Sequence, residues 1–120
     1  NNMANDFKRI CTPSIGTSLT TIYAVPAGPS SAALESIVIG ITMANKTTAG
    51  VTASIFIDNE DGSNDVYIVK DASIPAGASL EVMSGNKLVL MNDGSNADNL
   101  EALSNTANAV DVTVSVLEDV

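Results

Sequence analysis

The segment from Ile74 to Leu90 constrains the fold more than any other stretch, because it alternates tight turns with short apolar strands. Pro75 fixes its own φ near about −65°, and Gly77 can adopt the positive φ that closes a type II-like turn. Leu80 and Val82 then alternate with polar residues, which is the two-residue period of a half-buried strand. A Ser-Gly-Asn turn and a second apolar strand follow. The segment therefore predicts β-strands joined by tight turns.

The rest of the chain repeats this organisation. Val110–Val116 shows the clearest alternation, and 33–44 contains the longest apolar run, which predicts a central strand. On that strand we expect one face to carry Ile37, Ile39, Ile41 and Met43 and the other face Val38, Gly40 and Thr42. Further strands are expected at 7–11, 19–25, 51–57 and 65–70, two within 74–90, and a short, poorly patterned element at 99–103.

About eight or nine short strands, separated by turns every 8–12 residues or so, are typical of an all-β fold. We therefore expect a single-domain antiparallel β-sandwich of jelly-roll-like architecture. The expected division is an N-terminal arm at residues 1–15 and a β-sandwich domain at residues 16–120.

Composition narrows the class of function. Hydrophobic residues make up 45% of the chain but aromatic residues only 3%, so the core must be aliphatic. A mean hydropathy of +0.23 is high for an acidic domain and suggests that a neighbouring subunit covers some apolar surface.

The net charge of −9 argues against nucleic-acid binding. The sequence has no apolar run of membrane-spanning length and no signal-peptide pattern. A single cysteine, Cys11, excludes an intrachain disulfide.

Catalytic motifs are missing from the sequence. The chain has no histidine, so a Ser-His-Asp or Cys-His arrangement cannot form, and no phosphate-binding loop pattern occurs. We therefore expect a protein that is not an enzyme and has no cofactor.

The strongest candidate metal site is an acidic hairpin whose oxygens suit Ca²⁺, although its register does not fit an EF-hand. Its candidate ligands are Asp58, Glu60, Asp61 and Asp65. The competing interpretation is that these residues form a turn and keep the sheet end soluble. Carbohydrate binding is also open, but it usually needs aromatic platforms, and the chain has only two Tyr and two Phe.

Several stretches, taken in order, resemble small virion structural proteins of tailed bacteriophages. The resemblance covers roughly residues 19–118 and is carried by the following segments: 19–28 (Leu-Thr-Thr-Ile-Tyr-Ala-Val-Pro-Ala-Gly), 39–45 (Ile-Gly-Ile-Thr-Met-Ala-Asn), 67–70 (Tyr-Ile-Val-Lys), 74–81 (Ile-Pro-Ala-Gly-Ala-Ser-Leu-Glu), 87–90 (Lys-Leu-Val-Leu) and 115–118 (Ser-Val-Leu-Glu). It implies an all-β sandwich on the particle exterior, decorating the head or belonging to the neck and tail. The acidic loop at 92–99 departs from the pattern.

The functional hypothesis is therefore a capsid decoration (cement) protein that binds the outside of the head and stabilises contacts between capsomers. Its expected partners are the major capsid protein, copies of itself (for example as a trimer), or both, with assembly in the host cytoplasm. The expected contact residues are Phe7, Lys8, Arg9 and Ile10, because an arm can dock by main-chain hydrogen bonding. The alternatives are a neck or tail adaptor or fibre base, and, from another class, a carbohydrate- or calcium-binding adhesion module.

Overall fold

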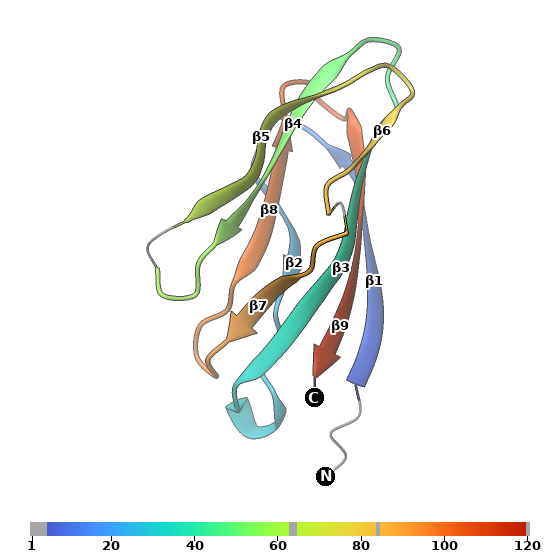
Figure 1. Ribbon diagram of the computed structural model, residues 1–120. Helices are drawn as coiled ribbons and strands as arrows, with labels where there is room; N and C mark the ends of the chain where they lie inside the picture. Colours follow the sequence, from blue (N-terminus) through green and yellow to red (C-terminus); the bar gives the residue numbers. More distant parts are fainter. Residues whose placement is uncertain (1–4, 63–64, 84, 120) are drawn as a thin grey trace.

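The computed structural model describes residues 5–62, 65–83 and 85–119, and shows two antiparallel sheets packed face to face (Figure 1). This part of the chain contains nine strands and one short 3₁₀ turn: β1 (Asn5–Ile15), β2 (Thr20–Ala24), η1 (Pro29–Ser31), β3 (Leu34–Asn45), β4 (Val51–Asp58), β5 (Val66–Ile74), β6 (Ser79–Glu81), β7 (Leu88–Asn92), β8 (Asn99–Ser104) and β9 (Val110–Asp119). The prediction of an all-β, single-domain antiparallel sandwich is confirmed. No helix in the described ranges has the length and apolar character needed to span a membrane.

The five-stranded sheet, called sheet A, has the order β1-β9-β3, with β6 and β7 both pairing with the other edge of β3. The four-stranded sheet, called sheet B, has the order β2-β8-β4-β5. We call the side of each sheet that faces the other sheet its inner face, and the opposite side its outer face. β3 is a central strand, as its long apolar run predicts.

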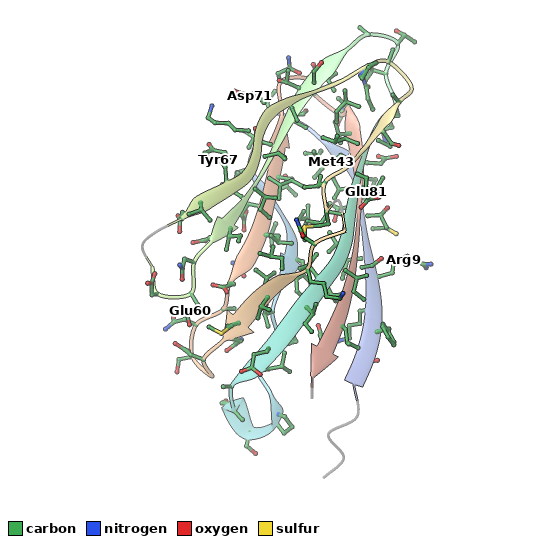
Figure 2. The ribbon with its side chains drawn as sticks, in the orientation of Figure 1. Arg9, Met43, Glu60, Tyr67, Asp71 and Glu81 are labelled. Carbon is green, nitrogen blue, oxygen red and sulfur yellow. The ribbon has the colours of Figure 1, made fainter. Side chains whose placement is uncertain are left out.

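The core lies between the inner faces and is mainly aliphatic. β9 supplies four valines to the core, each at most 1% exposed: Val110, Val112, Val114 and Val116. The residues that alternate with these valines lie on the outer face. Met43 of β3 also points between the sheets (Figure 2). Branched side chains pack well on a pleated surface, so this composition suits a strand core without aromatic residues.

A β-bulge in β3 changes which residues share a face. Val38 pairs with Val116 of β9 and Gly40 pairs with Ser115, so Ile39 is an extra residue. Val38, Ile41 and Met43 therefore lie on the inner face and are fully buried. The prediction that Ile37 and Ile39 share a face with Ile41 and Met43 is wrong, because the bulge shifts the alternation by one residue.

The Pro-Ala-Gly turn at 75–77 forms as predicted. Gly77 has a φ of +70°, and the backbone N–H of Ala78 donates to the carbonyl of Pro75 at 3.1 Å. The other Pro-Ala-Gly sequence, at 26–28, differs, because Gly28 has an extended backbone with a φ of −73°. The two identical sequences therefore do not form identical turns.

Two segments have a different role from the one their patterns suggest. The poorly patterned element forms β8, which lies between β2 and β4 at the centre of sheet B. Residues 5–15 of the expected arm form β1, whose residues Asn5–Thr12 pair with β9. Residues 1–4 lie outside the described ranges, and the division into an arm and a sandwich domain stays a prediction.

Candidate functional site

The outer face of sheet A carries an unbroken line of apolar side chains. Strand pairing places Phe7 opposite Leu117, Leu117 opposite Ile37, and Ile37 opposite Val89. These four residues, which we call the apolar row, cross β1, β9, β3 and β7 side by side. Phe7 is 73% exposed and Val89 57% exposed, whereas Leu117 and Ile37 are half-buried. In an isolated chain, the row therefore presents apolar surface to water.

Two further apolar residues widen this surface. Met91 follows Val89 on the same face of β7 and is 45% exposed. Ile39 is 42% exposed because the β3 bulge turns it outward. Contiguous apolar surface of this kind marks interaction sites more often than single exposed residues do.

Charged residues border the apolar row. Arg9 lies on the outer face of β1 next to Phe7 and forms no ion pair within the described part of the chain. Glu81 of β6 accepts a hydrogen bond of 2.9 Å from the hydroxyl of Thr42 on the adjacent β3. Figure 2 shows Arg9 and Glu81 projecting from the side of sheet A that faces away from sheet B.

The predicted contact residues divide between the two faces of β1. Phe7 and Arg9 lie on the outer face, and Phe7 belongs to the apolar row. Lys8 and Ile10 alternate with them and point to the inner side. There they line a groove of about 400 Å³ between β1 and β2, which we call the edge groove; its lining residues are Lys8, Ile10, Thr12, Thr21, Ile22, Tyr23, Ala24, Pro26 and Glu118. That these residues contact a partner stays a prediction.

A buried carboxylate lies at the base of the edge groove. Glu118 is 2% exposed and forms an ion pair of 2.8 Å with Lys8, which joins β1 to β9. The hydroxyl of Tyr23 donates to Glu118 at 2.6 Å, and the hydroxyl of Ser36 lies 3.0 Å from the Tyr23 oxygen. A buried charge with these partners is compensated, so the cluster ties sheet A to β2 of sheet B.

These contacts shift two pKa values upward. The hydrogen bond to Glu118, together with the negative charges of Glu118 and Asp6, raises the pKa of Lys8 above 10.5 despite its partial burial. Burial, and then the hydrogen bond to Glu118, raise the pKa of the Tyr23 hydroxyl well above its ordinary value. Both groups therefore keep their protons to a higher pH in the fold than they would in water.

The acidic hairpin uses its oxygens to bind backbone groups. Asp65 accepts a hydrogen bond from the N–H of Asn59 at 3.0 Å, and Asn59 accepts one from the N–H of Asp61 at 3.1 Å. Gly62 has the positive φ, +78°, that suits this turn. Asp58 lies at the end of β4 and is half-buried. Within the described ranges, no group of three or more Cys, Asp or Glu side chains is placed to hold a metal ion.

Asp98 connects this hairpin to the second acidic loop. Its carboxylate accepts from the N–H of Glu60 at 2.7 Å and from the N–H of Met91 at 2.9 Å. Desolvation contributes most to raising the pKa of Glu60, and the negative charges of Asp93, Asp98 and Asp61 raise it further. The described contacts are those of turn residues, and calcium binding by Asp58, Glu60, Asp61 and Asp65 stays a prediction.

The outer face of sheet B has a different row. Pairing aligns Thr21, Glu101, Phe56 and Tyr67 across β2, β8, β4 and β5. The hydroxyl of Thr21 donates to Glu101 at 2.7 Å, and the rings of Phe56 and Tyr67 lie 5.7 Å apart. Asp65 and Val66 border this aromatic pair in a pocket of about 160 Å³. In Figure 2, Tyr67 lies on the β5 side of the molecule, away from sheet A.

Sequence reasoning identified Phe7 but missed the other three members of the apolar row. The alternation puts Ile37 on the same face as Ile41 and Met43, because the β3 bulge is not visible in the sequence pattern. Val89 lies in the apolar run Leu88–Met91, and Leu117 lies beyond the clean alternation of β9. The run of apolar residues in β7, with no polar residue between them, is the signal that could have indicated apolar side chains on both faces.

Comparison with known proteins finds no matching protein family and no matching curated protein sequence. Among solved structures, the chain is similar to a protein from the disulfide-linked pili of Bacillus endospore appendages, with 12% identity, 99% of this chain and 90% of that chain covered, and a TM-score of 0.45. It is similar to a chain in the capsid of Helicobacter pylori bacteriophage KHP30, with 13% identity, coverage of 97% and 87%, and a TM-score of 0.49.

A third similar structure is that of infectious bursal disease virus, strain Gt, with 10% identity and a TM-score of 0.46. The chain aligns over 94% of its own length but spans only 30% of that viral chain. These neighbours come from two viruses and a pilus. At such identities and TM-scores, nothing about the function of this chain follows from them.

Proposed function

We propose that this protein is a non-enzymatic structural component of a virion, and specifically a decoration (cement) protein that binds the outside of the capsid. The observation that carries the proposal is the exposed apolar row on the outer face of sheet A. The resemblance of residues 19–118 to small structural proteins of tailed phages supports the virion setting.

The apolar row explains how such a protein would adhere. Burial of apolar surface contributes about 25 cal/mol per Å², so covering Phe7, Val89, Ile39 and Met91 with a neighbour favours binding. These side chains project from paired strands or from the β3 bulge, which gives the surface a fixed shape. A rigid surface loses little conformational entropy when it docks.

The charge distribution agrees with docking through the outer face of sheet A. The chain carries a net charge of −9, but the apolar row itself contains no charged residue. If sheet A faces the capsid, the acidic hairpin that contains Asp61, which joins β4 and β5 of sheet B, is left outside the contact. A negatively charged exterior would then keep particles apart and soluble.

The position and copy number of the chain in purified particles test the proposal. Quantitative mass spectrometry should find on the order of hundreds of copies per particle, because a head decoration follows the symmetry of the shell, and immunogold labelling should mark the head. Roughly a dozen copies or fewer, with label at the neck or tail, would favour the adaptor or fibre-base alternative. Absence of the chain from purified particles would contradict a virion role.

One observation favours a second candidate function, carbohydrate binding. The aromatic pair Phe56 and Tyr67, with Asp65 beside it, combines an apolar platform with a hydrogen-bond acceptor. The test is binding to a glycan array by wild-type protein and by Tyr67→Ala. Loss of a specific signal in the variant would support this function, and no binding by wild type would reject it. A calcium-dependent version would also require the thermal unfolding midpoint to rise with added Ca²⁺.

A further inference from the structure

The free edge of β1 differs from the other free edges of the two sheets. β1 pairs with β9 through eight consecutive residues, Asn5–Thr12, before its register shifts. Its other side has no strand partner within the described part of the chain. The edge strands of sheet B are less regular, because register shifts interrupt the pairing of both β2 and β5. β6 and β7, at the other margin of sheet A, are only three and five residues long.

Regular, exposed edges invite pairing with another strand unless the sequence blocks it. In β1 the blocking features gather at one end. Pro13 and the register shift after Thr12 disrupt the C-terminal part of the strand, where the N–H of Ser14 is bound by Asp111. The part from Asn5 to Arg9 is continuous, and its only inward-pointing cation, Lys8, is paired with Glu118. This part of the edge remains able to accept a strand.

The charges on the Asn5–Arg9 part of β1 complement those on the same part of a second copy. If a second copy of β1 lies antiparallel to the first, with a two-fold axis at Phe7, Asp6 of each copy is directly opposite Lys8 of the other. Lys8 is 46% exposed, so its ammonium group can reach a second carboxylate while it keeps Glu118. In the same register the two Phe7 side chains are opposite each other. Opposite charges and aromatic pairs at facing positions both favour strand pairing.

We propose that two copies of this chain associate through the Asn5–Arg9 edge of β1, antiparallel about a two-fold axis at Phe7. The two copies of sheet A then form one continuous sheet, and their apolar rows join into a single row twice as long. This inference goes beyond the proposed function and does not depend on it, because association in solution can be measured without any particle. It assigns a second copy as the partner of the predicted contact residues Phe7, Lys8 and Arg9.

Sedimentation velocity on the purified full-length chain tests the association. Wild type should sediment with twice the 12.3 kDa mass of one chain at high concentration. Asp6→Lys places like charges opposite each other, and Phe7→Ser removes the aromatic pair; we expect each to weaken association by about tenfold or more. The matched control is Val89→Ser, which changes the same apolar row at its far end and should leave association unchanged.

Disulfide trapping tests the register. In a Cys11→Ser background, Phe7→Cys should cross-link on mild oxidation at a protein concentration high enough to offset the lost aromatic pair, because directly opposite Cβ atoms in a sheet are about 4.5–5.5 Å apart. The matched control is Arg9→Cys in the same background. In the proposed register Arg9 faces Asn5, so the two sulfur atoms introduced at position 9 would lie about four residues, or roughly 14 Å, apart and should not cross-link.

Three results would overturn the proposal. The first is a wild-type chain that stays monomeric at about 100 µM, a concentration at which an interface of micromolar affinity would be filled. The second is a dimer that Val89→Ser dissociates and Phe7→Ser leaves intact, which would indicate face-to-face packing of sheet A. The third is faster cross-linking through position 9 than through position 7. Each result leaves the location of the chain in particles to be decided separately.

Discussion

The outer faces of the two sheets show how one architecture can carry two kinds of surface. Each has a row of four paired residues that crosses four strands. On sheet A the row is apolar throughout, from Phe7 to Val89. On sheet B it runs from the hydrogen-bonded pair Thr21–Glu101 to the aromatic pair Phe56–Tyr67. The polar half of the sheet B row satisfies its own hydrogen bonds, whereas the sheet A row leaves apolar area that a neighbour could cover.

Three glutamates extend this comparison, because each of them is buried to a different degree. Glu118, on the inner side of sheet A, is 2% exposed and bound by Lys8 and Tyr23. Glu101, on the outer face of sheet B, is 8% exposed and bound by Thr21. Glu81, on the outer face of sheet A, is exposed and bound by Thr42. Burial rather than strand position should therefore decide how much each contact contributes to stability.

The largest expected loss of stability distinguishes a position on the inner face of sheet A from its neighbour on the outer face. Val114→Asp places an unpaired charge at a fully buried position of β9 and should lower the free energy of unfolding by about 3–5 kcal/mol. Thr113→Asp, the adjacent residue on the outer face, should change it by less than about 1 kcal/mol. Urea unfolding measures both. Equal losses in the two variants would mean that the assignment of faces on β9 is incorrect.

The next largest loss of stability is expected when the ion pair between Lys8 of β1 and Glu118 of β9 is removed. Lys8→Met leaves Glu118 with Tyr23 as its remaining strong partner, and we expect a loss of about 1 kcal/mol at pH 7, since Lys8 is half exposed. The pKa of Lys8 is raised in the fold, so this contribution is complete below pH 10.5 and is lost as the pH rises through the folded pKa. The difference between wild type and variant should therefore shrink in strongly alkaline solution.

Lys46→Met is the control for this ion pair, because Lys46 pairs with Asp111 at 2.9 Å with both side chains more than 40% exposed. It should cost less than about 0.5 kcal/mol. A Lys46 variant less stable than the Lys8 variant would contradict the importance assigned to burial of Glu118.

The smallest expected difference compares matched threonine–glutamate pairs on the two outer faces. Thr21→Val removes the donor to the shielded Glu101 and should cost about 1 kcal/mol. Thr42→Val removes the donor to the exposed Glu81, where water replaces the hydroxyl, and should cost less than about 0.5 kcal/mol. Thermal and urea unfolding of both variants measure the difference. A Thr42 variant as unstable as the Thr21 variant would show that the two faces are equally shielded.

The sequence predicts most strands of this fold because strand chemistry is local. Alternation located β9, the apolar run located β3, and Gly77 located its turn. The central position of β8 could not be predicted from alternation, because Leu100, Glu101 and Ala102 are all buried. A buried polar residue between two apolar ones looks like a surface position until its neighbours are known.

The candidate site was less predictable for a physical reason. The apolar row exists only through the register of four strands that are far apart in the chain. One extra residue at Ile39 exchanges the expected faces of Ile37 and Val38 relative to the rest of β3. Phe7 could be selected because it lies in the N-terminal segment, which is expected to dock as an arm by main-chain hydrogen bonding. Its alignment with Leu117, Ile37 and Val89 depends on long-range pairing, which no short pattern encodes.

Occupancy of particles by two matched valine variants tests most directly whether the outer face of sheet A is the docking surface. Val89 on sheet A is 57% exposed and Val66 on sheet B is 52% exposed, so aspartate at either position should leave the fold intact. We predict that Val89→Asp lowers the number of copies bound per particle by about tenfold or more, since it buries a charge in the contact. We predict that Val66→Asp binds like wild type. Normal occupancy by Val89→Asp, with loss of binding by Val66→Asp, would contradict the account.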